Sequence, residues 1–381
     1  MSIAYTDLPS DARVIRETKE AADRGANVTL LVPRSSDTRC PAGLENSEIY
    51  WLAVPEQRGH TTLFGQYRFM RAIAEWRRGR SAVPDIVHVH NMPDYLYWAV
   101  RDWHQAGARV VLDVHDIMSH LAVHRFRGLK RRLATSTLTF LEHSVWRRVD
   151  HVITVTEAYR EVIARSGVPR ERISVVLNTP DPAVMRPDQR REPKGGVYKI
   201  VFHGAVTDRS GIESVVRAMP RVLEEVSEAH VLVIGTGDGR RAVHTAIADL
   251  GLSNHVEFLD RYVALSEVVG YIADAHAGVV PTKRSSYTDH ILPVRFLEYA
   301  TLGVPIVATR LPLLDHYVGE EAAYFVPQPE PGAIAEGLIR LAQDPGYCRR
   351  IVQRARQFTQ DHPWSRYADT LAKGLGLQAA E

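Results

Sequence analysis

The stretch Leu292-Pro293-Val294-Arg295-Phe296-Leu297-Glu298-Tyr299-Ala300-Thr301-Leu302-Gly303-Val304-Pro305-Ile306-Val307-Ala308 predicts a helix that leads into a buried strand. Pro293 suits a first helical turn, and Gly303 with Pro305 ends the helix before the strand. The helix carries Glu298 on a segment that must pack against a sheet, where an ionised group is costly without a hydrogen-bond partner. Two hypotheses follow. Glu298 binds a diol, as acidic residues bind ribose in dinucleotide sites, or it remains partly exposed on an amphipathic helix.

The composition indicates a globular protein with two domains. A chain of 381 residues is too long for one ordinary core, and 45% apolar with 24% charged residues is usual for a soluble protein. The net charge of +2 argues against a nucleic-acid binder. Cys40 and Cys348 offer neither metal-site spacing nor a disulfide framework, which fits a reducing compartment. We expect no signal peptide and no membrane-spanning segment, and therefore a cytoplasmic protein.

Short β-rich runs alternate with helical patterns along the chain, which predicts parallel sheets covered by helices on both faces. The predicted strands are residues 2–5, 28–32, 48–53, 86–89, 110–113, 152–154, 173–177, 199–203, 231–234, 256–258, 278–280, 306–308 and 323–326. The predicted helices are residues 12–24, 65–78, 95–105, 156–166, 211–226, 240–250, 265–275, 294–302 and 332–344.

A polar segment at residues 183–196, rich in proline and glycine, is the predicted linker between the domains. The N-terminal domain is then residues 1–190, and the C-terminal domain is residues 197–361. Ligands of open α/β sheets bind at the carboxyl ends of the strands. We therefore expect two doubly wound domains that face each other across a ligand-binding cleft.

The loop His203-Gly204-Ala205-Val206-Thr207-Asp208-Arg209-Ser210-Gly211 joins the first strand of the second domain to its first helix. Its glycines let the backbone turn tightly and bring Arg209 near the helix N-terminus, which predicts a diphosphate site. A loop with a solvated Arg209 is the alternative. A second glycine-rich turn, residues 235–239, lacks the acidic residue of an NAD site, so we expect it only to border the nucleotide.

Polar side chains gather at two neighbouring strand ends of the first domain. His115 and Asp116 follow one strand, while His88, His90 and Asn91 end the preceding strand. The spacing of these histidines matches no standard metal site. We expect the group to contact a polyol or to carry a proton, with a purely structural role as the alternative for His88, which lies deeper in the sheet.

The run His124-Arg125-Phe126-Arg127-Gly128-Leu129-Lys130-Arg131-Arg132 is strongly basic and opens an amphipathic helix. A solvated helix face is one interpretation. The other is contact with a phosphorylated acceptor or an anionic lipid, which would place residues Arg125 to Arg132 on the inner face of the plasma membrane.

Taken in order, these features resemble the family-4 retaining glycosyltransferases, which have the two-domain GT-B fold. Residues 11–14 and 24–28 resemble the opening helix of that family, residues 87–94 and 112–116 its sugar-side strand ends, residues 175–178 the end of its N-terminal domain, residues 203–211 its phosphate loop and residues 292–308 its ribose-binding helix. Trp364 resembles the tryptophan on the helix, here about residues 362–381, that crosses back to the first domain. The resemblance covers nearly the whole chain.

The resemblance implies a hexosyltransferase-type enzyme with a nucleotide-sugar donor held mainly by the C-terminal domain. The implied catalytic residues are His115, Arg209, His290 and Glu298. The implied donor-binding residues are Gly204, Arg209, Arg261, Tyr262, Val263, Asp289, His290, Ile291, Leu292, Pro293, Val294, Arg295 and Glu298. The implied acceptor-binding residues are Asp7, Pro9, His90, Asn91 and Asp116, and the acceptor is a glycan, a lipid-linked precursor or a small natural product.

One departure from the family concerns its paired glutamates. The second glutamate matches Glu298, but His290, with Asp289 beside it, stands near the place of the first. Either residue takes over that donor contact, or the donor preference differs. The resemblance also implies that the acceptor attacks the donor sugar on the face from which the diphosphate leaves, so that the anomeric configuration is retained. We expect no cofactor and no metal, because Arg209 and Arg295 can neutralise the leaving diphosphate.

Two other functions stay open at this stage. A nucleotide-sugar epimerase or hydrolase on the same scaffold would turn over the donor without an acceptor. A non-catalytic nucleotide-sugar-binding partner subunit would explain the missing glutamate. The transferase is preferred because Arg209, Glu298 and His115 are all present.

Overall fold

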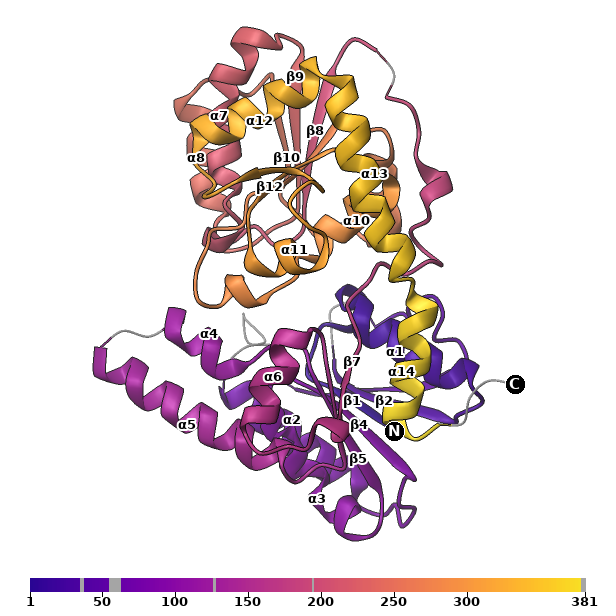
Figure 1. Ribbon diagram of the computed structural model, residues 1–381. Helices are drawn as coiled ribbons and strands as arrows, with labels where there is room; N and C mark the ends of the chain where they lie inside the picture. The colour runs from indigo at the N-terminus through magenta and orange to yellow at the C-terminus, as the bar shows by residue number, and fades with distance from the viewer. Residues whose placement is uncertain (35–37, 55–62, 126–127, 194, 378–381) are drawn as a thin grey trace. The chain divides into compact units, whose positions relative to one another are not determined.

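The computed structural model describes residues 1–34, 38–54, 63–125, 128–193 and 195–377, without the side chains of His124 and Arg125. The chain forms two compact units (Figure 1). The first unit contains Met1–Asn178 and Ser365–Glu381, and the second contains Thr179–Trp364. Residues 179–190, assigned above to the N-terminal domain, belong to the second unit.

The first unit is built on a parallel sheet of seven strands in the order β3-β2-β1-β4-β5-β6-β7. Its strands are β1 (Ser2–Ala4), β2 (Val28–Pro33), β3 (Ser47–Leu52), β4 (Ile86–His90), β5 (Arg109–Val114), β6 (His151–Thr154) and β7 (Ile173–Val175). Its helices are η1 (Leu8–Ser10), α1 (Ala12–Asp23), α2 (Leu63–Arg77), η2 (Asp94–Leu96), α3 (Tyr97–Gln105), α4 (Met118–Arg125), α5 (Gly128–Trp146), α6 (Glu157–Arg165), η3 (Arg170–Arg172) and α14 (Trp364–Leu375).

The second unit is built on a parallel sheet of six strands in the order β10-β9-β8-β11-β12-β13. Its strands are β8 (Tyr198–His203), β9 (Ala229–Ile234), β10 (Val256–Leu259), β11 (Ala277–Val280), β12 (Ile306–Thr309) and β13 (Tyr324–Val326). Its helices are η4 (Pro187–Gln189), η5 (Asp208–Ser210), α7 (Ile212–Glu225), α8 (Arg240–Asp249), α9 (Leu265–Ala273), η6 (Thr288–His290), α10 (Val294–Leu302), α11 (Pro312–Tyr317), α12 (Pro331–Gln343) and α13 (Pro345–Asp361).

Helices cover both faces of each sheet, because its strands carry apolar side chains on both faces and these must be buried. In the second unit α7, α8 and α12 pack together over one core, while α10 contacts α9 and α13. In the first unit α2, α3 and α6 share a core with β4 and β5, and α1 packs in a separate cluster with β2. The prediction of two α/β domains with parallel sheets is confirmed.

The C-terminal helix α14 belongs to the first unit (Figure 1). Leu371 and Leu375 are buried, and the Arg109 guanidinium donates to the Gly374 carbonyl oxygen at 3.0 Å. Arg24, the C-cap residue of α1, forms an ion pair with Asp369 at 2.7 Å. The returning helix is therefore held by apolar packing together with polar contacts.

Candidate functional site

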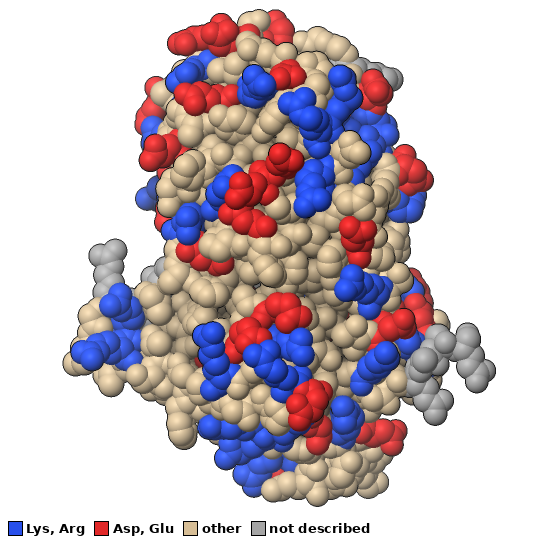
Figure 2. All heavy atoms as spheres, in the orientation of Figure 1, with Lys and Arg blue, Asp and Glu red and all other residues tan. Residues whose placement is uncertain are grey.

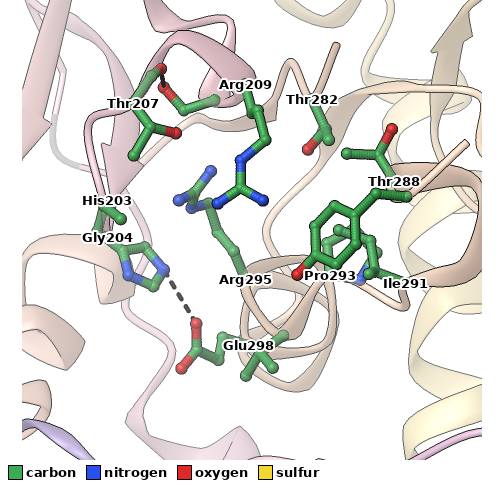
Figure 3. A pocket seen from close by; sticks show the side chains of 14 residues that line it. His203, Gly204, Thr207, Arg209, Thr282, Thr288, Ile291, Pro293, Arg295 and Glu298 are labelled. Carbon is green, nitrogen blue, oxygen red and sulfur yellow. Dashed lines mark hydrogen bonds and ion pairs between the residues drawn. The ribbon is translucent and has the colours of Figure 1, made fainter. Parts of the chain in front are cut away.

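The loop after β8 forms one wall of a pocket in the second unit. The pocket has a volume of about 370 Å³ and is lined by His203, Gly204, Ala205, Thr207, Arg209, Ser210, Thr282, Tyr287, Thr288, Ile291, Pro293, Val294, Arg295 and Glu298 (Figure 3). Gly211 caps α7 with φ +67°, and a Cβ there would lie 1.8 Å from the Pro281 carbonyl oxygen. Only glycine fits this turn, which keeps the loop close to the strand ends.

Two guanidinium groups face this pocket (Figure 3). Arg209 lies over the Tyr287 ring at 4.9 Å, and Arg295 lies over the Phe202 ring at 3.8 Å. Burial lowers the pKa of Arg295. Within the described residues neither arginine forms an ion pair with a carboxylate, whereas the nearby Lys283 is paired with Asp208 at 2.6 Å. Two unpaired cations in one pocket suit a ligand with multiple negative charges.

Glu298 is buried on α10 and has a partner that the sequence interpretation missed. Its Oε2 lies 3.1 Å from Nε2 of His203, the last residue of β8 (Figure 3). The fold therefore places an imidazole nitrogen beside this carboxylate. His203 could have been found from its place at a strand end next to the glycine loop.

The structure separates the predicted donor-binding residues into two groups. Those that line the pocket are Gly204, Arg209, Ile291, Pro293, Val294, Arg295 and Glu298. Those outside its lining are Arg261, Tyr262, Val263, Asp289, His290 and Leu292. Residues of the lining that the sequence interpretation did not single out are His203, Ala205, Thr207, Ser210, Thr282, Tyr287 and Thr288.

Asp289 and His290, the two candidates for the missing glutamate, both have local partners. Asp289 accepts two hydrogen bonds from Arg284, at 3.0 and 3.1 Å. Nδ1 of His290 lies 2.7 Å from the Ser286 carbonyl oxygen. Farther along the chain, Arg261 pairs with Glu267 at 3.3 Å, Val263 is buried and Tyr262 is exposed.

The first unit contains a second pocket, at the carboxyl ends of β1, β4 and β5. Its volume is about 350 Å³, and its lining is Ala4, Tyr5, Thr6, Asp7, Ser10, Asp11, Val14, Gln66, His90, Asn91, Met92, His115 and Asp116. The lining includes His115 and the predicted acceptor residues Asp7, His90, Asn91 and Asp116, but not Pro9.

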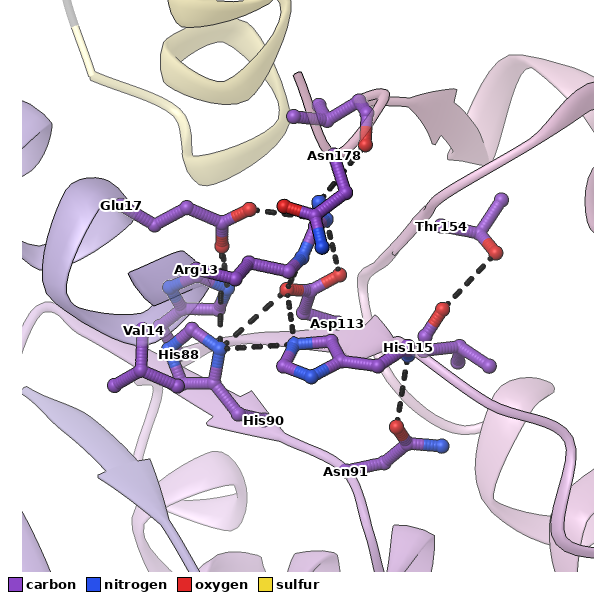
Figure 4. A network of polar contacts seen from close by, with 12 residues as sticks. Arg13, Val14, Glu17, His88, His90, Asn91, Asp113, His115, Thr154 and Asn178 are labelled. Carbon is purple, nitrogen blue, oxygen red and sulfur yellow. Dashed lines mark hydrogen bonds and ion pairs between the residues drawn. The ribbon is translucent and has the colours of Figure 1, made fainter. Parts of the chain in front are cut away.

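Behind this pocket lies a buried network centred on Asp113 (Figure 4). Arg13 donates to both of its carboxylate oxygens at 2.8 Å, and His115 Nε2 lies 2.7 Å from Oδ2. Burial alone would raise the pKa of Asp113, but Arg13 and His115 outweigh burial and hold that pKa well below its usual value. Asp113 is thus an ionised carboxylate under a histidine of the pocket.

Glu17, His88, His90 and Asp113 offer ligand atoms within 4.8 Å of one another, as a metal site would. However, Arg13 lies 2.9 Å from Glu17 and 2.8 Å from Asp113. Burial raises the pKa of Glu17 well above its usual value, even with Arg13 beside it, and lowers the pKa of His88 and His90. The guanidinium already supplies the positive charge that an ion would bring.

Asn91 connects the ends of β4 and β5. Its Oδ1 accepts from the His115 backbone N–H at 2.8 Å, and its Nδ2 donates to the Asp116 carbonyl at 2.6 Å (Figure 4). Below it, the buried Asp94 accepts from the Trp146 indole at 2.9 Å. Burial raises the pKa of Asp94 to about 6, and burial together with Asp94 raises the pKa of Glu142 to about 8.

The basic run lies where α4 passes into α5. Lys130, Arg131 and Arg132 are exposed at the start of α5, where blue spheres gather at the left of Figure 2. Leu129, Leu133 and Phe140 on the same helix are 72%, 61% and 69% exposed. Phe126 and Arg127 lie outside the described residues. No helix in the described ranges has the length and apolarity that crossing a bilayer requires.

Comparison with known families identifies both units. Residues 12–179 match the Glycosyl transferase 4-like domain, and residues 197–344 match Glycosyl transferases group 1. Together these two matches span most of the chain, which therefore belongs to the glycosyltransferases that combine the two domains. The family-4 resemblance is thereby confirmed.

Individual relatives of this glycosyltransferase chain are distant. It is 23% identical over 216 residues to WcaL of Escherichia coli, named as a colanic acid biosynthesis glycosyltransferase, in an alignment that covers 56% of this chain and 53% of WcaL. It is 26% identical over 218 residues to the glycosyltransferase MJ1607 of Methanocaldococcus jannaschii, with 54% of each chain covered. The chain thus spans about half the length of these curated relatives.

Solved structures confirm the fold. Sucrose-phosphate synthase from Thermosynechococcus elongatus superposes with a TM-score of 0.75 at 18% identity, over 98% of both chains. HepE from Anabaena, in complex with UDP-glucose, superposes with a TM-score of 0.72 at 13% identity, over 98% of this chain and 99% of HepE. The GT-B fold expected from the sequence is shared with these proteins.

Proposed function

We propose that this protein is a glycosyltransferase that moves a sugar from a nucleotide-diphosphate donor to an acceptor hydroxyl, with retention of anomeric configuration. The observation that carries the proposal is the pocket in the second unit, where Arg209 and Arg295 form no ion pair with any described residue and Glu298 also lines the pocket. Arg209 and Arg295 bind the diphosphate, and Glu298 with His203 binds the ribose. The UDP-glucose complex of the structurally similar HepE supports this class of donor.

The chemistry needs no protein nucleophile. The acceptor oxygen attacks the anomeric carbon on the face from which the diphosphate departs, and the bond from that carbon to the diphosphate oxygen breaks. The departing oxygen takes the proton of the acceptor hydroxyl. Arg209 and Arg295 stabilise the negative charge that develops on the diphosphate, a contribution that is often the largest in such sites.

The proposal includes independence from metal ions, because two guanidinium groups can stabilise the charge that a divalent ion neutralises elsewhere. Transfer that is lost in EDTA and restored by Mg²⁺ would contradict this part. The acceptor is a glycan or lipid-linked precursor, a choice supported by the polysaccharide pathway named for WcaL.

The proposal also places the protein in the cytoplasm, at the inner face of the plasma membrane. The exposed Lys130, Arg131 and Arg132 would contact anionic lipid, and Leu129 and Leu133 would enter the headgroup region. A lipid-linked acceptor would then lie at the surface where the protein binds.

The first experiment is a thermal-shift screen over UDP-, GDP-, ADP- and TDP-sugars, because a ligand that binds the folded state raises its melting temperature. The best donor is then incubated with candidate acceptors, and products are identified by mass spectrometry. Transfer supports the proposal. Turnover without any acceptor would instead favour an epimerase or hydrolase, and binding without turnover would favour a non-catalytic subunit.

Replacement of Arg209 tests the role of the cations. Arg209→Ala should lower turnover about 100-fold or more, the effect of removing one group that stabilises transition-state charge. The melting temperature should change little, because Arg209 is exposed and forms no ion pair with the described residues. Arg217→Ala, at an exposed arginine paired with Glu213 on α7, is the matched control. Equal turnover in the two variants would refute the assignment.

A further inference from the structure

The carboxylate of Asp113 is buried and has no contact with solvent. Its Oδ1 accepts from Arg13 Nη2 at 2.8 Å, and its Oδ2 accepts from Arg13 Nε at 2.8 Å. The remaining close partner of Oδ2 is Nε2 of His115, at 2.7 Å. Arg13 and His115 can both donate a hydrogen bond, and so can the adjoining Glu17 carboxyl, because burial raises its pKa well above its usual value.

These contacts determine which nitrogen of His115 carries the proton. The pKa of Asp113 lies well below its usual value, because the effects of Arg13 and His115 exceed that of burial. An ionised carboxylate only accepts hydrogen bonds. Nε2 of His115 must therefore be protonated. In the neutral ring Nδ1 then has the free lone pair.

The rest of the network keeps this arrangement rigid. Arg13 Nη2 also contacts Glu17 at 2.9 Å, and its Nη1 donates to the Val176 carbonyl oxygen at 2.9 Å. The backbone N–H of His115 donates to Asn91 at 2.8 Å. His115 is thus held through its backbone N–H and through ring atom Nε2. Its side chain is 20% exposed and lines the pocket.

His90 is the other ring near this contact. Its Nδ1 lies 3.4 Å from both Asp113 Oδ2 and His115 Nε2, and its Nε2 lies 3.1 Å from the Ser2 hydroxyl. At 2.7 Å the contact from His115 to Asp113 is shorter and stronger than either. His90 therefore does not displace the proton of His115 Nε2.

We propose that Asp113, Arg13 and Glu17 are positioning residues that hold His115 in its Nε2–H tautomer and leave Nδ1 as the ring atom that can accept a hydrogen bond. The tautomer rests only on the contacts around Asp113 and does not depend on the proposed function. At this point the pocket then selects a hydroxyl, which can donate, over an ether or carbonyl oxygen, which cannot.

The tautomer is measured directly by long-range ¹H–¹⁵N correlation on protein labelled with ¹⁵N-histidine, at about pH 8 so that free imidazoles are neutral. His115→Gln assigns the signals, because it removes one set. His151→Gln, at a histidine bonded to Ser174 away from the pocket, removes a different set. We expect His115 to show a protonated Nε2 and an unprotonated Nδ1. The opposite tautomer, or an even mixture, would overturn the proposal.

Asp113→Asn tests the positioning role. We expect the His115 signals to move to a mixture of tautomers, because an amide presents both a donor and an acceptor. Unchanged signals would refute the role of Asp113. Where Asp113→Asn does not fold, Arg13→Lys is measured in its place. This variant keeps the positive charge but loses the two parallel hydrogen bonds to Asp113. A mixture of tautomers would again support the positioning role, and unchanged His115 signals would refute it.

Glu17→Gln leaves Arg13 bonded to Asp113 and should shift the His115 signals less than either of these variants. A shift from Glu17→Gln as large as that from Asp113→Asn would contradict the order of contacts proposed here.

Discussion

At the residue scale, Gly204 shows how the donor pocket depends on a missing side chain. Its φ of +106° is strained for other residues, and a Cβ there would lie 2.7 Å from Nη2 of Arg295. The family resemblance implied Gly204 as a donor-binding residue. The structure adds that this glycine leaves the space in which the guanidinium of Arg295 lies.

Gly204→Ala should therefore displace Arg295 and weaken binding of the nucleotide sugar about tenfold, a change of about 1.4 kcal/mol. Isothermal titration with the best donor of the thermal-shift screen measures the effect. Gly107→Ala is the matched control, because Gly107 has a φ of +103° and nothing within 4 Å of an added Cβ. The two variants should lose similar stability, and equal donor affinity in both would contradict the role of Gly204.

The buried Glu142 predicts how stability depends on pH. Burial and Asp94 raise its pKa to about 8, whereas a glutamate in the unfolded chain has a pKa of about 4. The folded protein therefore holds this proton where the unfolded chain has lost it, so this group lowers stability as pH rises from about 4 to about 8.

Glu142→Gln removes that ionisation and keeps an oxygen for the Ser119 N–H, which lies 3.1 Å from Oε1. The variant should match the wild type near pH 4 and be more stable near pH 8, by on the order of 1–3 kcal/mol. Melting temperatures across this pH range measure the difference. A difference that does not grow with pH would show that Glu142 titrates normally in the folded protein.

At the element scale, strands were easier to predict than helices. Each predicted strand is present within a few residues, because a strand buried on both faces is a continuous apolar run. Helix α13 was not predicted. Its buried residues Ile351, Ala355 and Phe358 follow helical spacing, but they stand among many charged residues. In addition, the pair Asp344-Pro345 resembles the end of the preceding helix. The structure uses that pair as a helix start, with Asp344 accepting from Tyr347 N–H at 2.8 Å.

Helix α5 carries the prediction about membranes. Replacing Lys130, Arg131 and Arg132 with Gln should lower binding to vesicles that contain anionic lipid about 100-fold at low salt, because each cation near such a surface contributes about 1 kcal/mol. Co-sedimentation with phosphatidylglycerol vesicles measures the loss, and neutral phosphatidylcholine vesicles serve as the control.

Leu133→Ser with Phe140→Ser should weaken binding to the same vesicles through lost apolar burial, with little change in salt dependence. Val197→Ser, at another exposed apolar residue, is the matched control. If the charge variants and the apolar variants both bind anionic vesicles as tightly as Val197→Ser does, α5 is not the lipid-contacting surface.

At the scale of the whole molecule, the first unit is assembled from two separate segments of the chain. Leu371 on α14 is completely buried, while Asp369 on the same helix is 67% exposed in its ion pair with Arg24. The stability of the N-terminal sheet thus depends on residues at the far end of the sequence.

Leu371→Ala should destabilise the first unit by about 2–5 kcal/mol, the usual cost of emptying a buried leucine site. Asp369→Ala should cost less than about 1 kcal/mol, because its ion pair is near the surface. Hydrogen exchange read by mass spectrometry should show faster exchange in β4 and β5 for Leu371→Ala, and unchanged exchange in β8 and β9. Equal acceleration in both units would show that α14 stabilises more than the first unit.

The two parallel sheets, the glycine loop with Arg209 and the family could be predicted from local patterns: apolar runs, turn residues and their order along the chain. It also placed His90, Asn91, His115 and Asp116 together, since carboxyl ends of neighbouring parallel strands meet at one edge.

The pairing of those residues, in contrast, is visible only in the folded molecule. The contact of His203 with Glu298 joins residues 95 positions apart, and the contact of Arg13 with Asp113 joins residues 100 positions apart. Such pairs depend on which side chains share a buried space, and no local pattern records that. For the same reason the proton on His115 follows from the fold, because Arg13 on helix α1 holds the charge of Asp113 on strand β5.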